Sequence, residues 1–92
     1  MTIIEETIRS VNKIRRKLGM KNISKLPRGV PQDPTYCPLA KATGLEVLDG
    51  GYYTNTSEQT KKLGGIFHRY SKAAQRFIDN FDNGKYPHLV LK

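Results

Sequence analysis

The chain of 92 residues has one cysteine, no tryptophan and no long apolar run. A single cysteine cannot close an internal disulfide, so nothing suggests the oxidising compartments where disulfides are common. Without about 18 consecutive apolar residues, or a charged leader followed by an apolar segment, the sequence predicts neither a membrane span nor a secretory signal. We therefore expect a cytoplasmic protein, and the length predicts a single domain over residues 1–92.

Acidic residues are also scarce, and they are unevenly distributed along the chain. Sixteen lysines and arginines face eight aspartates and glutamates, which gives a net charge of +8. No acid lies between Glu6 and Asp33, and none lies between Gln59 and Ile78. Charge concentrated in this way attracts polyanions such as nucleic acid, and it serves an acidic protein partner equally well. Solvated faces that bind nothing are the remaining interpretation of these two basic stretches.

The sequence predicts a small basic binding protein that contacts nucleic acid, DNA or RNA, through the basic faces of its helices. Its candidate contact residues are Lys13, Arg16, Lys17, Lys21, Lys25, Arg28, Arg69, Lys72 and Arg76. Tyr52 and Tyr53 can stack on bases if they are exposed. No base-reading motif is visible, so binding is expected to be independent of sequence and to weaken steeply with salt. The alternative is an adaptor or inhibitor that docks on an acidic surface of a host protein. No membrane partner is expected, and both a monomer and a homodimer are compatible with the sequence.

No constellation of catalytic or metal-binding residues is visible, so we expect neither an enzyme nor a cofactor. Cys37, His68 and His88 lie far apart in sequence and are too few for a structural zinc site. Asp79 and Asp82 are one helical turn apart, but solvent-facing polar residues near a helix end are the simpler interpretation. Cys37 precedes a predicted helix whose dipole could lower the pKa of the thiol. A buried, inert cysteine is the favoured alternative because no base is near in sequence.

Helical periodicity predicts two amphipathic helices, one of them long. Thr2 and Glu5 form a capping box at the start of the first helix, residues 3–18. Arg15 falls on the apolar face of that helix, where it either extends its charge to solvent or serves as an ion-pair or anion-binding group. The second helix is predicted over residues 57–83. It contains Gly64-Gly65, which indicates a kink, a helix start or a close backbone approach.

The remaining segments predict an α+β fold in which these helices pack on a small antiparallel sheet. Three prolines within residues 26–37, with Pro38 directly after them, predict an extended segment, interpreted as a rigid brace rather than an exposed binding loop. Pro38 begins a short helix over residues 38–43. Asp49-Gly50-Gly51 provides the turn of a hairpin over residues 45–54. The C-terminal segment, residues 86–91, is expected to add a third strand.

Two sequence motifs resemble those of a family of short proteins. Leu-Pro-x-Gly followed by Cys-Pro-Leu-Ala, and a later Phe-Asp-x-Gly-x-Tyr-Pro, resemble motifs of short proteins from actinobacteria and their phages to which no activity is assigned. The matching positions are Leu26, Pro27, Gly29, Cys37, Pro38, Ala40, Phe77, Phe81, Asp82, Gly84, Tyr86 and Pro87. The resemblance implies a phage or mobile-element origin and no catalytic residue. The abundance of Lys, Asn and Ile departs from those proteins and suggests a different host.

Overall fold

The computed structural model describes residues 1–91, which form helices around a small antiparallel sheet, as the sequence predicts. The elements in chain order are α1 (Ile3–Lys17), α2 (Pro38–Thr43), β1 (Glu46–Leu48), β2 (Gly51–Tyr53), α3 (Ser57–Leu63), β3 (Phe67–Arg69), α4 (Lys72–Asp82) and the 3-10 helix η1 (Pro87–Leu89). The three strands lie in the order β1-β2-β3, with each neighbouring pair antiparallel. The α+β class is therefore confirmed.

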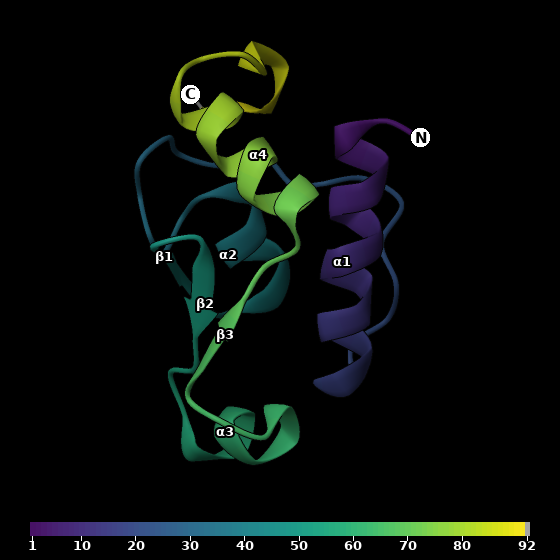
Figure 1. Cartoon of the computed structure of the whole chain (residues 1–92), viewed down its shortest axis with the longest axis vertical. Helices are drawn as coiled ribbons and strands as arrows, with labels where there is room; N and C mark the ends of the chain where they lie inside the picture. Colours follow the sequence, from purple (N-terminus) through teal and green to yellow (C-terminus); the bar gives the residue numbers. More distant parts are fainter. Residues whose placement is uncertain (92) are drawn as a thin grey trace.

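The helix α1 runs along one side of the molecule and the sheet lies on the other, with α2 between them (Figure 1). The helix α4 packs on α1. The helix α3 forms part of the connection between β2 and β3 and lies at the end of the molecule opposite α4 (Figure 1). The core between these layers contains the fully buried side chains of Val11, Leu39, Phe77 and Phe81. Burial of these apolar groups is the main stabilising contribution in so small a protein.

Local capping signals define α1 and α2 as the sequence indicates. The Thr2 hydroxyl accepts a hydrogen bond from the Glu5 backbone N–H, and the Glu5 carboxylate accepts one from the Thr2 N–H. The helix α1 ends at Lys17, one residue before the predicted end, because Leu18 serves as its C-cap. The helix α2 begins at Pro38 and ends before Gly44, whose φ of 74° is the left-handed conformation that glycine tolerates.

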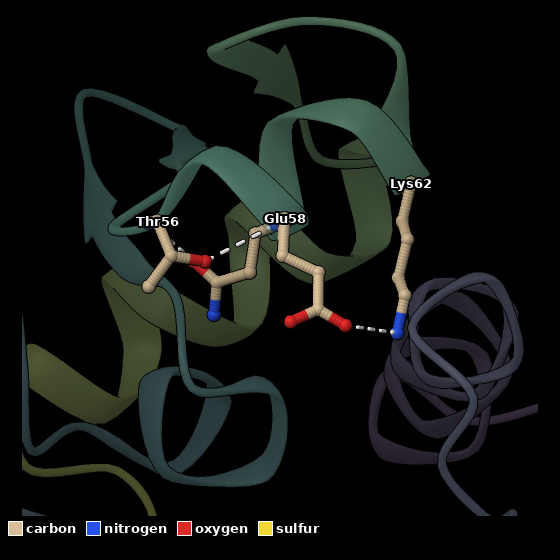
Figure 2. A network of polar contacts seen from close by, with 4 residues as sticks. Thr56, Glu58 and Lys62 are labelled. Carbon is tan, nitrogen blue, oxygen red and sulfur yellow. Dashed lines mark hydrogen bonds and ion pairs between the residues drawn. The ribbon is translucent and has the colours of Figure 1, made fainter.

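The prediction of one long helix over residues 57–83 is wrong. Thr56 caps the start of α3, which contains the Glu58–Lys62 ion pair (Figure 2). The helix ends at Leu63, and its C-cap, Gly64, has a φ of 76°. The chain then reverses, and residues 67–69 pair with β2 before α4 begins at Lys72. The apolar spacing fits a continuous helix, but Gly64 and Gly65 adopt positive φ angles that interrupt it. Residues 67–69 then satisfy their backbone hydrogen bonds by pairing with β2.

The predicted C-terminal strand over residues 86–91 is also wrong. Pro87 begins the 3-10 helix η1, and only Val90 makes a bridge, an isolated parallel one to Gly29. The Gly29 N–H donates to the Leu89 carbonyl at 2.8 Å, and the Leu91 N–H donates to the Gly29 carbonyl at 2.8 Å. The third strand of the sheet is β3 instead. Pro87 lacks the N–H that a strand ladder needs, so the tail pairs with the proline segment rather than with the sheet.

The segment of residues 26–37, hereafter the brace, joins several parts of the fold. Besides the tail, it bonds to α4 through the Gln32 N–H, which donates to the Asp82 carboxylate at 2.8 Å. It also bonds to the sheet edge, where the Val47 N–H donates to the Pro34 carbonyl at 2.8 Å. Cys37 at the end of the brace is buried. These contacts explain the stiff proline-rich sequence as a structural connection.

Candidate nucleic-acid interface

A hollow of about 240 Å³ lies between α1 and the β3 edge of the sheet. Its lining residues are Ser10, Lys13, Ile14, Lys17, Tyr52, Arg69, Tyr70 and Ser71. Three of them are cations, and they come from the two acid-free stretches of the sequence. The fold therefore brings both basic stretches to one place, which we call the cationic hollow.

Each cation reaches the cationic hollow because of its position in an element. Lys13 and Lys17 are one turn apart on α1, so they lie on the same face of that helix. Arg69 is the last residue of β3, an edge strand of the sheet. The Ser10 hydroxyl of α1 lies 2.7 Å from the Ser71 hydroxyl, which caps the start of α4, and this contact ties the two helices together. This contact also ties α1 to the chain two residues after Arg69.

The cations of the cationic hollow have no acidic partner. Across residues 1–91, the Glu58–Lys62 pair in α3, at 3.0 Å, is the one ion pair that forms (Figure 2). All nine sequence-predicted contact residues are exposed. Within the described part of the chain their side chains make no hydrogen bond, with one exception: Arg16 donates to the Asn22 side-chain oxygen at 3.2 Å. Their positive charge therefore faces solvent without local neutralisation.

The structure divides the other predicted contact residues between different surfaces. Lys72 and Arg76 line a neighbouring shallow hollow between α1 and α4, together with Glu6. Lys25 lines a hollow with Ile4 on another flank of α1. Arg16 and Lys21 lie near the end of α1, and Arg28 lies in the brace. Of the nine, the cationic hollow therefore brings together Lys13, Lys17 and Arg69.

Two other cations donate hydrogen bonds to backbone carbonyls. The Arg15 guanidinium donates to the Lys21 carbonyl at 2.7 Å and to the Ala42 carbonyl at the end of α2. The Lys41 ammonium donates to the Arg28 carbonyl at 2.7 Å. Arg15 thus makes backbone contacts that the sequence did not predict, and these contacts link α1 to the C-terminal end of α2.

The aromatic residues near the cationic hollow differ from the expectation. Tyr52 is 8% exposed and stacks on His68, with ring centroids 5.3 Å apart, so it is not open to a base. Tyr53 is half-buried on the other face of the sheet. Beside it lies Phe67, which is 38% exposed. Sequence reasoning missed Phe67 because it assigned that residue to the buried stripe of a long helix; the Gly64-Gly65 interruption was the signal against that helix.

No nucleophile or metal site accompanies these groups in the described chain. Burial raises the pKa of the Cys37 thiol, and the Cys37 sulfur accepts a hydrogen bond from the Ala40 N–H at 3.4 Å. Burial likewise raises the pKa of Tyr70, whose hydroxyl lies near Thr43 but outside hydrogen-bond geometry. No group of three or more His, Cys, Asp or Glu side chains among residues 1–91 is placed to hold a metal ion. A thiol kept protonated in this way is a structural group rather than a reactive one.

A second hollow, of about 270 Å³, lies beside the brace and has the opposite charge. Its lining includes the carboxylates of Asp33, Asp49 and Asp82. Asp33 accepts hydrogen bonds from the Thr35 and Tyr36 N–H groups at 2.9 and 3.1 Å, and Asp82 accepts one from the brace. At least two of these acids therefore serve the local backbone.

No family model matches the chain, and no curated protein or solved structure matches it either. The resemblance to short phage-related proteins, with the origin that it implies, therefore stays a prediction. Among residues 1–91, none of the helices combines the length and the apolar character needed to cross a bilayer.

Proposed function

We propose that this small basic protein binds nucleic acid, DNA or RNA, with the cationic hollow as the centre of its phosphate contacts. The observation that carries the proposal is the convergence of Lys13, Lys17 and Arg69, without an acidic partner, around one hollow. Two separate stretches of the chain contribute these residues. A charge layout that served only solubility would not need them in one place.

Electrostatics gives this arrangement a direct use. Three cations around one hollow repel one another, and no acid within ion-pair distance relieves that repulsion. Phosphate groups would neutralise it, and the release of counterions from the nucleic acid would add to the free energy of binding. Lys72 and Arg76 on α4 offer two further cations, although Glu6 lines the same hollow as they do. Such contacts position a phosphate backbone without reading its bases.

The test is binding of labelled DNA and RNA, measured by fluorescence anisotropy at about 50 and about 200 mM salt. The double variant Lys13→Gln/Lys17→Gln is expected to lower the slope of log affinity against log salt by about 2, because each lysine removed loses about one phosphate contact. The matched control is Lys61→Gln/Lys85→Gln, which removes the same charge from exposed positions away from the cationic hollow. Its slope should stay close to that of the unmodified protein.

Two results would argue against the proposal. If the protein binds no nucleic acid at the lower salt concentration, the function is refuted, and an acidic protein surface becomes the partner to seek, since the same cations would serve it. If both double variants weaken binding equally, net charge rather than the cationic hollow is responsible. Circular dichroism of both variants checks that the fold is intact.

A further inference from the structure

The outer face of the sheet carries aromatic side chains beside the cationic hollow. Side chains alternate between the two faces of a strand, so Tyr52 and His68 share the inner face while Tyr53 and Phe67 share the outer one. Tyr53 and Phe67 are directly paired across β2 and β3, and their ring centroids are 4.7 Å apart. This pair is the centre of the exposed face.

Glycine at position 51 explains the position of the Phe67 ring. A Cβ on Gly51 would lie 2.5 Å from the ring carbon Cε1 of Phe67, so the ring rests directly against the glycine backbone. Even so, Phe67 remains 38% exposed and its neighbour Ile66 is 63% exposed. The side chain is therefore fixed on one side and open to solvent on another, which suits a rigid surface for contact.

Arg69 connects this face to the cationic hollow. Its guanidinium carbon lies 5.9 Å from the centre of the Phe67 ring, and Arg69 also lines the hollow that contains Lys13 and Lys17. A phosphate held by these cations would therefore belong to a nucleotide next to the aromatic pair. Glu46 lies on the same face, across from Tyr53 in β1, so the phosphate path is expected along the β3 side.

We propose that the outer face of β2 and β3 stacks unpaired bases on Phe67 and Tyr53, so that the protein prefers single-stranded nucleic acid to a duplex. This inference rests on the proposed function and specifies its ligand. Aromatic rings stack on the faces of bases, and those faces are accessible in single strands, whereas in a duplex neighbouring base pairs cover them. A positive hollow beside the exposed ring of Phe67 and the half-buried ring of Tyr53 is the combination that proteins use to bind single strands.

The first experiment compares Phe67→Leu with the unmodified protein on a thymidine strand, a uridine strand and a duplex, each of about 15 nucleotides per strand. Leucine still covers Gly51 but has no aromatic face. We expect single-strand affinity to fall about five- to tenfold, within the range for loss of one stacked base, and duplex affinity to change less than about twofold. The DNA and RNA strands show whether the sugar matters. Tyr36→Leu is the matched control, because Tyr36 is 59% exposed in the brace, outside this face.

A second variant gives a direct signal of stacking. The chain has no tryptophan, so Phe67→Trp introduces a single fluorescent indole at the proposed contact. Its emission should be quenched when the single strand is added and should change little with the duplex. Circular dichroism and thermal unfolding establish that each variant is folded before binding is measured.

The outcomes separate this inference from the proposed function. If Phe67→Leu leaves the ratio of single-strand to duplex affinity unchanged, and the indole of Phe67→Trp is not quenched, base stacking is refuted. A reduced salt slope in Lys13→Gln/Lys17→Gln would in that case still support nucleic-acid binding. Failure of the unmodified protein to bind any of the three probes would refute both.

Discussion

Charged side chains are hydrogen-bonded to the backbone around the brace, whereas at the cationic hollow they are free of such bonds within the described residues. In and around the brace, Asp33 and Asp82 accept hydrogen bonds from backbone N–H groups, and Lys41 donates to a backbone carbonyl. At the cationic hollow, the side chains of Lys13 and Lys17 make no hydrogen bond or ion pair within residues 1–91. Polar groups engaged with the backbone hold a fold together, whereas exposed charges without partners contribute little to stability. Substitutions should therefore affect stability at the brace and binding at the hollow.

The largest effect on stability is expected from Gly29→Ala in the brace. A Cβ at this position would lie 2.5 Å from the Pro38 nitrogen and 2.6 Å from the Cys37 carbonyl carbon, so the backbone itself would have to move. We expect a loss of about 2–3 kcal/mol, which corresponds to a decrease in Tm of about 10–20 °C. Thermal unfolding followed by circular dichroism measures it. An unchanged Tm would contradict the close packing of the brace on the start of α2.

A smaller loss is expected from Arg15→Gln, which shares α1 with the cations of the hollow. The substitution removes the hydrogen bonds to the Lys21 and Ala42 carbonyls and should cost about 1–2 kcal/mol in urea unfolding. Arg9→Gln is the matched control, because Arg9 is exposed on the same helix and its side chain makes no hydrogen bond in the described chain. The salt slope of nucleic-acid binding should not change in Arg15→Gln. A changed slope would mean that the division between structural and binding cations is wrong.

The smallest effect is a pH dependence that comes from the brace. Hydrogen bonds from the Thr35 N–H and hydroxyl hold the pKa of the Asp33 carboxyl below its ordinary value. The unfolded chain therefore takes up this proton at a higher pH than the folded protein does. The stabilisation is present above the ordinary pKa and is lost as the pH falls through the lowered one.

The measurement is the urea midpoint from about pH 6 to about pH 3 in the unmodified protein and in Asp33→Asn. The substitution should flatten the decline of the midpoint with acid. Asp49→Asn is the control, because it removes an exposed acid whose carboxylate accepts no hydrogen bond from any group among residues 1–91. Equal flattening in both variants would show that overall charge, and not the Asp33 hydrogen bonds, causes the decline.

Much of the fold follows from short-range signals in the sequence. The Thr2–Glu5 capping box and the Pro38 and Gly44 boundaries define α1 and α2, and Asp49-Gly50 defines the turn between β1 and β2. Each of these signals acts within a few residues, so it needs no knowledge of the rest of the chain. The exposed side of α1, which carries Lys13 and Lys17, was predictable for the same reason.

The second half of the chain was not predictable by this reasoning. Apolar residues from Leu63 to Phe81 fit helical spacing, and the periodicity alone cannot show that Phe67 belongs to a strand. Pairing with β2 decides it, and that pairing joins residues 14 to 18 positions apart in the chain. In the same way, the predicted strand over residues 86–91 does not join the sheet because the tail pairs with Gly29 of the brace.

Composition and local capping act within single segments, so they were enough to specify the charge of this protein, the acid-free stretches, the capped helices and the turn of the hairpin. Long-range packing was needed to place Arg69 beside Lys13 and Lys17 and to leave the Phe67 ring open on the outer face of the sheet. Both results depend on β3, whose pairing with β2 places a residue from the second basic stretch next to the first. Hydrogen bonds between distant segments, rather than local propensity, therefore formed the candidate site.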